Sequence, residues 1–210
     1  MRGAMNERRI GRTNLSVSEL GFGGAPLGNM FRTLDDASAL AAVEASAACG
    51  IRYFDTAPMY GFGLSEVRLG QAIKPMVREE IVISSKVGRT LTPVDPSQVT
   101  PGIWDQPLPM RADIDFSYDA VMRSFESTLK RLDTPFVDML AIHDPDEAAV
   151  SAGLDPYSRS HFKAAMDGAY PALYELRRRG LQVQDPRSFL RPSFGHGLAL
   201  MQPEDSVYGA

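Results

Sequence analysis

The sequence is poor in cysteine, tryptophan and histidine, with one Cys, one Trp and three His among 210 residues. A single cysteine, Cys49, excludes an intramolecular disulfide and suits the reducing cytoplasm, where we expect the protein to reside. Cys49 stands beside Gly50 at the expected end of a helix. We therefore expect it to be a small buried side chain and not a reactive thiol.

Long apolar runs and an excess of positive charge are also missing. No run approaches the roughly 20 residues that span a bilayer, and residues 1–10 lack the apolar core of a signal peptide. The net charge of −4 gives no electrostatic footprint for nucleic acid or an anionic membrane surface. With 44% hydrophobic residues, the chain is expected to form one globular domain.

Apolar segments alternate with segments of helical periodicity, after a short hairpin expected at residues 9–17. The expected strands are 19–23, 51–54, 81–85 and 136–142. The expected helices are 35–48, 65–73, 117–132 and 160–179. Such alternation with short links is typical of parallel β/α units. A doubly wound sheet is the alternative, but no G-x-G-x-x-G opens a helix here. We therefore predict an α/β fold, the first four units of a (β/α)8 barrel, which takes about 250 residues when complete.

Two stretches do not fit the alternation. Residues 88–116 are rich in proline and polar residues and are expected to form a long loop, which is uncommon inside a domain unless functional. Trp104 lies in this loop, either as an anchor or as a wall of a substrate pocket. Residues 181–210 show no clean periodicity and are interrupted by prolines. The expected organisation is a partial barrel over 1–180 and a poorly ordered tail over 181–210.

Titratable residues stand at the ends of three expected strands. Asp55 and Tyr60 follow one strand, Lys86 ends the next, and His143 ends the fourth. A buried carboxylate needs a partner, and Lys86 supplies one. Singly, each residue has an ordinary structural explanation, such as an aspartate that caps a turn. Together, at the carboxyl ends of parallel neighbours, they form one candidate site.

The neighbouring acids Asp144 and Asp146 raise the question of a metal site around His143. No second histidine lies at ligand spacing, so we expect no metal.

The sequence around these residues resembles that of a known superfamily. The stretch G-I-R-Y-F-D-T-A-P-M-Y-G, followed by S-E-V-R-L-G, is similar to the aldo-keto reductase signature. I-V-I-S-S-K-V-G and L-A-I-H-D continue it in order, and the resemblance spans about residues 9–180. D-F-S-Y-D-A-V-M-R-S-F-E-S-T-L-K-R-L and F-K-A-A-M-D-G-A-Y-P-A-L resemble a bacterial branch, the D-threo-aldose (L-fucose) 1-dehydrogenases and pyridoxal 4-dehydrogenases.

The resemblance implies a catalytic tetrad of Asp55, Tyr60, Lys86 and His143. Tyr60 would carry the proton that accompanies hydride transfer. A free tyrosine has a pKa of about 10, and an adjacent Lys86 ammonium is expected to lower it. Asp55 would keep Lys86 charged, and His143 would orient the substrate oxygen.

The resemblance also implies NADP or NAD as cofactor, without deciding between them. Gly24 and Asp55 would lie near the nicotinamide, and Trp104 and His143 would line the substrate pocket. The expected activity is oxidation of an aldose to a lactone, or reduction of an aldehyde or ketone, with pyridoxal as the second candidate substrate.

In the resembled superfamily the second half of the barrel holds most of the cofactor, and the resemblance here ends at Gly180. We expect a truncated or frameshifted reading of a longer gene. Three hypotheses therefore stay open: an active oxidoreductase, a catalytically incomplete fragment, or an interaction protein that pairs through open strand edges.

Overall fold

The computed structural model describes residues 5–11, 13–146 and 159–179 of the chain. The prediction for the tail over 181–210 therefore lies outside the described residues. Within the described part, no helix is long and apolar enough to cross a bilayer.

Four short strands form one parallel sheet in the order β3 (Gly21–Gly23), β4 (Tyr53–Asp55), β5 (Val82–Val87) and β8 (Met139–Ile142). Their register places Asp55 opposite Ser84 and Lys86 opposite Ala141. The expected strand order is confirmed, so the strand ends that carry the candidate residues are neighbours.

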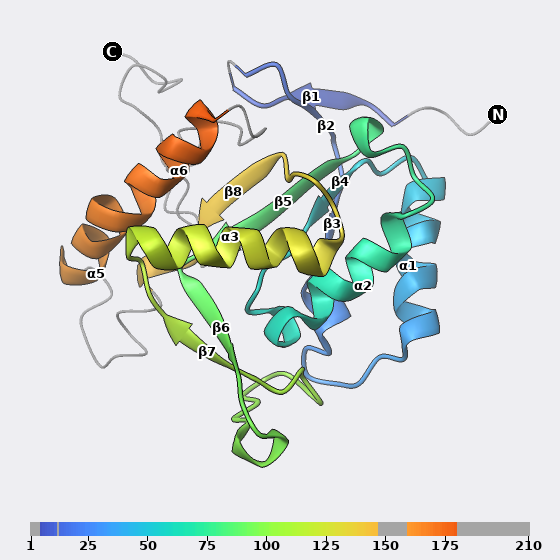
Figure 1. Ribbon diagram of the computed structural model, residues 1–210. Coiled ribbons are helices and arrows are strands. Elements are labelled where there is room, and N and C mark those ends of the chain that lie inside the picture. Colours follow the sequence, from blue (N-terminus) through green and yellow to red (C-terminus); the bar gives the residue numbers. More distant parts are fainter. Residues whose placement is uncertain (1–4, 12, 147–158, 180–210) are drawn as a thin grey trace.

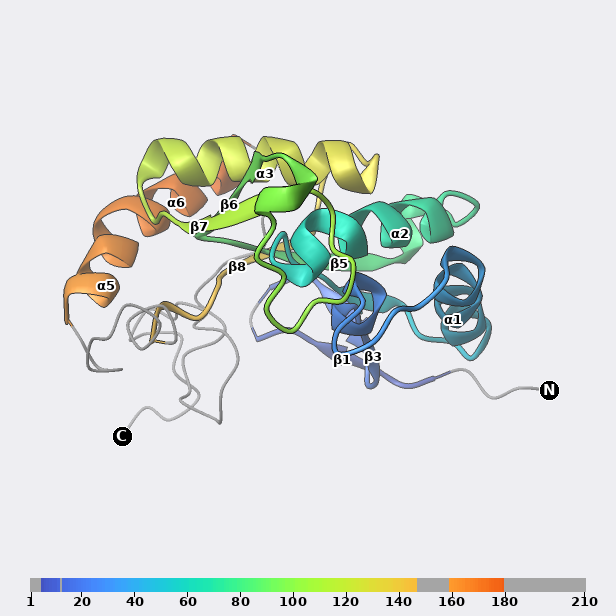
Figure 2. The same ribbon diagram turned by 90° about the horizontal axis from the view of Figure 1, so that it is seen from below.

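The helices lie on one side of this sheet (Figure 2). They are α1 (Asp36–Ala48), α2 (Leu64–Ile73), α3 (Tyr118–Leu132), α5 (Arg159–Ala164) and α6 (Tyr170–Arg178). The side chains of Asp35 and Ser117 cap α1 and α3, because each accepts a hydrogen bond from a backbone amide in the first turn of its helix. α2 packs against α1 and α3, and α3 packs against α6. A continuous apolar core fills the space between helices and sheet, as expected for half of a barrel.

Two antiparallel hairpins lie at opposite ends of the sheet (Figure 1). β1 (Glu7–Arg9) and β2 (Ser16–Ser18) form the first, where the parallel strands begin. Val17 of this hairpin packs against Val82 and Met139 in a second, smaller apolar cluster. The hairpin therefore covers the end of the sheet that is opposite to the candidate site.

The second hairpin corrects the expectation of a long loop over residues 88–116. β6 (Arg89–Pro93) and β7 (Met110–Ile114) pair from Arg89 with Ile114 to Pro93 with Met110. A proline is tolerated at the last position of a strand, as at the end of β6. The other prolines of the stretch lie between the two strands. The prolines thus mark the connection and not the whole segment.

Two smaller expectations are also wrong. Cys49 is exposed, because α1 ends one residue before it and its side chain lies outside the core. A 3.6-residue period over the helix expected at 160–179 predicts Phe162 on its inner face, yet Phe162 is 46% exposed. A π-helical segment, Ala165–Ala169, separates α5 from α6, so a 3.6-residue period does not hold across it.

Candidate active site

β4 and β5 bring a carboxylate and an ammonium together at their carboxyl ends. The Lys86 Nζ donates to Asp55 Oδ2 at 2.7 Å and to the Thr56 carbonyl at 3.0 Å. Lys86 is only 8% exposed. A buried ammonium needs such partners to remain charged, and these two hold it at a fixed position.

Tyr60 reaches the same place from the turn that follows β4. There the backbone crosses that of Gly28, and a Cβ on Gly28 would come 2.5 Å from the Tyr60 carbonyl carbon. On the other side of the crossing, Gly61 has a φ of 63°, a conformation that glycine adopts without strain. The Lys86 Nζ lies 4.8 Å from the centroid of the Tyr60 ring. The close backbone crossing therefore fixes the phenol beside the ammonium.

His143 and Trp104 flank the phenol. His143 follows β8, where its amide donates to the Val87 carbonyl at 2.8 Å, and its ring lies 5.8 Å from that of Tyr60 at 88°. The Trp104 ring lies 5.6 Å from Tyr60, and Trp104 is 5% exposed. The structure thus brings Asp55, Tyr60, Lys86 and His143 together and adds Trp104 at one side. Their catalytic roles stay predictions.

The charges of the site act on one another. Burial alone would lower the pKa of Lys86, but the Asp55 carboxylate and the Tyr60 phenol outweigh it and raise that pKa above its ordinary value. Burial raises the pKa of Tyr60, and the Lys86 charge offsets this only in part. The effect of Lys86 has the expected sign, whereas the pKa of Tyr60 lies on the opposite side of its ordinary value from the one expected.

Gly24 lies where β3 meets the end of β4. Its amide donates to the Asp55 carbonyl at 2.7 Å, and a Cβ in its place would come 2.5 Å from the same oxygen. The glycine therefore permits a close strand-to-strand approach beside Asp55. Its contact with a cofactor stays a prediction.

Two residues that the motif analysis did not single out also contact this group. Ser84 donates to Asp55 Oδ1 at 2.6 Å, and its Oγ lies 3.1 Å from the Tyr53 hydroxyl. The signal was available: side chains two apart in a strand share a face, so Ser84 accompanies Lys86 and Tyr53 accompanies Asp55.

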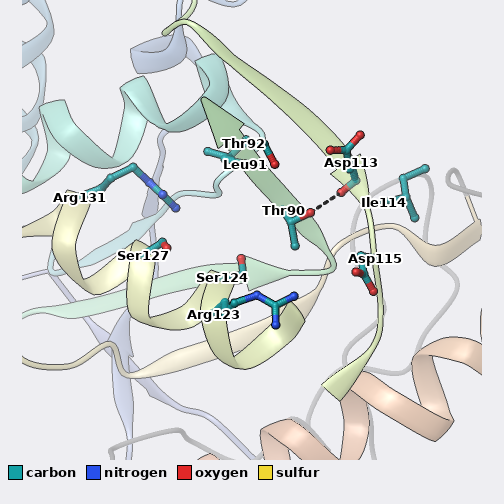
Figure 3. Close-up of a pocket in the computed structure, with 10 residues that line it drawn as sticks. All are labelled: Thr90, Leu91, Thr92, Asp113, Ile114, Asp115, Arg123, Ser124, Ser127 and Arg131. Atoms are coloured by element: carbon teal, nitrogen blue, oxygen red, sulfur yellow. Dashed lines mark hydrogen bonds between the residues drawn. The ribbon is translucent and has the colours of Figure 1, made fainter. Parts of the chain in front are cut away.

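A polar hollow of about 450 Å³ lies elsewhere, between the β6–β7 hairpin and α3 (Figure 3). Its lining residues are Thr90, Leu91, Thr92, Asp113, Ile114, Asp115, Arg123, Ser124, Ser127 and Arg131. Two of its charges are already engaged, since Arg131 pairs with Glu66 and Asp113 pairs with Arg111. None of the tetrad residues lines it, so the strand ends are the better candidate site.

The arrangement can move a proton. A phenol beside a fixed ammonium can give a proton to a nearby oxygen or take one from it. This donor set fits the reactive end of a nicotinamide cofactor and a carbonyl substrate. Within the described residues we find no group of three His, Cys, Asp or Glu side chains that could hold a metal ion.

Comparison with known proteins identifies the family to which the chain belongs. The profile of the Aldo/keto reductase family matches residues 19–182. Pyridoxal 4-dehydrogenase of Microbacterium luteolum is 39% identical over 84% of this chain and 53% of its own length. D-threo-aldose 1-dehydrogenase of a Pseudomonas species is 37% identical over 80% of this chain and 48% of its own.

A solved structure extends the likeness to the fold. An aldo-keto reductase from Bacillus halodurans, in its holo form, superposes with a TM-score of 0.62 at 26% identity, over 84% of this chain and 48% of that one. The chain therefore spans about half the length of the relatives it matches. Sequence profile, relatives and fold agree that this chain belongs to the aldo/keto reductase family.

Proposed function

We propose that the chain is an NAD(P)-dependent oxidoreductase that oxidises an aldose at its hemiacetal carbon to a lactone, or reduces an aldehyde or ketone. The observation that carries this proposal is the 2.7 Å ion pair between Lys86 and Asp55, with the Tyr60 ring 4.8 Å from the same ammonium. An ordinary buried ion pair needs no phenol beside it, whereas proton transfer to a reacting oxygen needs a positioned acid, and this phenol can serve as one.

Each tetrad residue has a distinct task in this mechanism. Tyr60 gives its proton to the carbonyl oxygen during reduction and takes it back during oxidation. Lys86 favours the phenolate by its charge, and Asp55 holds Lys86 charged and in place. His143 donates a hydrogen bond to the substrate oxygen and so fixes its direction. When bound, the nicotinamide supplies or accepts the hydride, with Gly24 and Asp55 as the residues proposed beside its ring.

The pH dependence of the rate in each direction follows from the pKa of Tyr60. Burial keeps this pKa above its ordinary value, so at neutral pH the phenol is protonated and ready to act as an acid. Oxidation requires the phenolate, whose fraction grows with pH. We therefore expect the oxidation rate to rise on the alkaline side, and the reduction rate to fall there.

The substrate class rests on two relatives, one named for an aldose and the other for pyridoxal. Both compounds present a hydroxyl or carbonyl oxygen to a proton donor. The Trp104 ring beside Tyr60 offers an apolar wall on which either a sugar ring face or an aromatic ring could stack. We place the aldose first and pyridoxal second.

A second proposal is that the chain holds the tetrad but lacks part of the cofactor site. The supporting observation is that it spans only about half the length of its relatives.

One experiment separates the two proposals. NADPH and NADH fluorescence titrations of the full chain are followed by turnover assays with L-fucose and with pyridoxal in the presence of NADP⁺ or NAD⁺, beside Tyr60→Phe as control. Saturable binding and turnover that Tyr60→Phe lowers by at least about a hundredfold would support the oxidoreductase. No saturable binding of either cofactor would support the incomplete site instead.

A further inference from the structure

The carboxylate of Asp55 is held at both of its oxygens. Oδ2 accepts from Lys86 at 2.7 Å, and Oδ1 accepts from Ser84 at 2.6 Å. Ser84 is 5% exposed and lies directly opposite Asp55 in the parallel ladder. The last torsion of an aspartate is broad, so the side chain alone does not fix the plane of its carboxylate. A short hydrogen bond from a buried hydroxyl does fix it.

Tyr53 completes this arrangement on the far side of Ser84. Its hydroxyl lies 3.1 Å from Ser84 Oγ. A serine hydroxyl has one proton, and the closer, charged acceptor, Asp55, takes it. We infer that the Ser84 oxygen is then left to accept from the Tyr53 hydroxyl. Burial and the nearby Asp55 charge raise the pKa of Tyr53, which keeps its hydroxyl protonated and able to donate.

We propose that Ser84 is a positioning residue for Asp55, with Tyr53 as the group that orients the Ser84 hydroxyl. The Asp55 carboxylate then has a donor on each side. Lys86 donates to one oxygen, and Ser84, whose hydroxyl Tyr53 orients, donates to the other. The plane of the carboxylate is fixed so that Oδ2 faces the ammonium. The inference deepens the proposed function, on which it rests, because it adds two residues to the same site.

Loss of the Ser84 hydroxyl affects the site in a specific way. The carboxylate loses one donor and can rotate, so the direction in which Lys86 is held becomes less defined. The side chain of Ser84 is hydrogen-bonded to Asp55 and Tyr53 and is not among the groups proposed to bind substrate. The expected effect therefore falls on kcat and leaves KM nearly unchanged.

The kinetic test compares Ser84→Ala with Ser85→Ala in the full chain. Ser85 is the next residue of β5, is also buried, and donates to Glu66 at 3.0 Å instead of to Asp55. We expect Ser84→Ala to lower kcat about tenfold, the equivalent of one hydrogen bond to a charged group, with KM unchanged. Ser84→Thr keeps the hydroxyl and is expected to restore most of kcat. Equal kcat values for the two alanine variants would overturn the inference.

A second measurement needs neither substrate nor cofactor. With ¹⁵N-labelled lysine, the Lys86 ammonium gives a proton–nitrogen NMR signal, assigned by its loss in Lys86→Arg. We expect Ser84→Ala to move this signal and to speed its exchange with water, while Ser85→Ala leaves it in place. A signal that stays in place in folded Ser84→Ala overturns the inference, whatever the turnover.

The two measurements keep the inference separate from the proposed function. If no variant and not even the unaltered chain turns over substrate, a moved signal in Ser84→Ala still supports the positioning role, while the proposed function fails. If Ser84→Ala does not fold, Tyr53→Phe decides, because it removes only the far hydroxyl. A displaced Lys86 signal in Tyr53→Phe supports the inference, and an unmoved signal overturns it.

Discussion

Lys86 and Tyr60 are two titratable groups whose pKa values both lie above their ordinary values. A group with a raised folded pKa binds its proton more tightly in the folded state than in the unfolded state. Its contribution to stability is complete below the unfolded pKa and is lost as the pH rises through the folded pKa. For Lys86 and Tyr60 the unfolded values are about 10.4 and 10.

We therefore expect the free energy of unfolding to stay level from neutral pH to about pH 9 and to fall above about pH 10. Urea unfolding at a series of pH values measures this. Tyr60→Phe removes one of the two groups and should make the fall shallower. Tyr118→Phe, at a 37% exposed position on α3, is the matched control and should leave the profile unchanged. Equal profiles for the two variants would contradict the assignment to Tyr60.

At the scale of single residues, the sequence predicted that the four tetrad residues lie together. Titratable side chains at the carboxyl ends of neighbouring parallel strands lie at the same edge of the sheet. The sequence did not predict the pKa of Tyr60, since burial depends on the packing of Trp104 and His143 around the ring. It also left the partner of Ser84 open. Alternation gives the face of a strand, whereas the hydrogen-bond partner depends on the register with β4.

Among the elements, the turn after β4 depends on the crossing of two glycine backbones. We expect Gly28→Ala to destabilise the fold by about 2 kcal/mol, because its Cβ would force the Tyr60 backbone away. Gly23→Ala is the control: a Cβ there meets nothing within 4 Å, and we expect a change within about 0.5 kcal/mol. Urea midpoints measure both. A Gly28→Ala midpoint equal to that of Gly23→Ala would contradict this account of the turn.

The contact between α2, β5 and α3 rests on a buried charge. Glu66 is fully buried, and its carboxylate accepts from Arg131 at 2.6 Å and from Ser85 at 3.0 Å. Arg131→Leu leaves that carboxylate buried without its cation, which we expect to cost about 3 kcal/mol. Lys130→Leu changes an exposed neighbour and should cost within about 0.5 kcal/mol. Chemical denaturation of both variants is the measurement, and a mild Arg131→Leu would argue against a charged Glu66.

The four β/α units were predictable because their periodicity is local. The β6–β7 hairpin was not predictable, because a long proline-rich connection separates its two strands. Nothing in the local sequence of either strand shows that it pairs with the other. The π segment inside the last helix was equally hidden. An extra residue in a helical turn leaves no mark on composition, and it is what places Phe162 outside the core.

For the molecule as a whole, the connection between β6 and β7 is tied to the loops that follow β3 and β4. The Asp105 amide donates to the Asn29 carbonyl at 2.9 Å, the Phe31 amide to the Ile103 carbonyl at 2.8 Å, and the Leu108 amide to the Gly61 carbonyl at 3.1 Å. Trp104 lies in the middle of these bonds and packs on Tyr60. The hairpin is therefore joined to the sheet at the candidate site, and not only through its own strands.

Such joining predicts cooperative unfolding. Trp104, the one tryptophan of the chain, reports on the hairpin connection, while far-ultraviolet circular dichroism reports on the helices. We expect the two signals to follow the same curve in urea, because the connection cannot open without breaking its bonds to both loops. A tryptophan transition at lower urea would mean that the connection opens alone. The double variant Thr33→Val with Asp105→Ala removes a side-chain hydrogen bond between the connection and the loop after β3. If bonds to this loop couple the connection to the rest of the fold, the urea midpoints of the tryptophan and circular dichroism signals should separate in this variant.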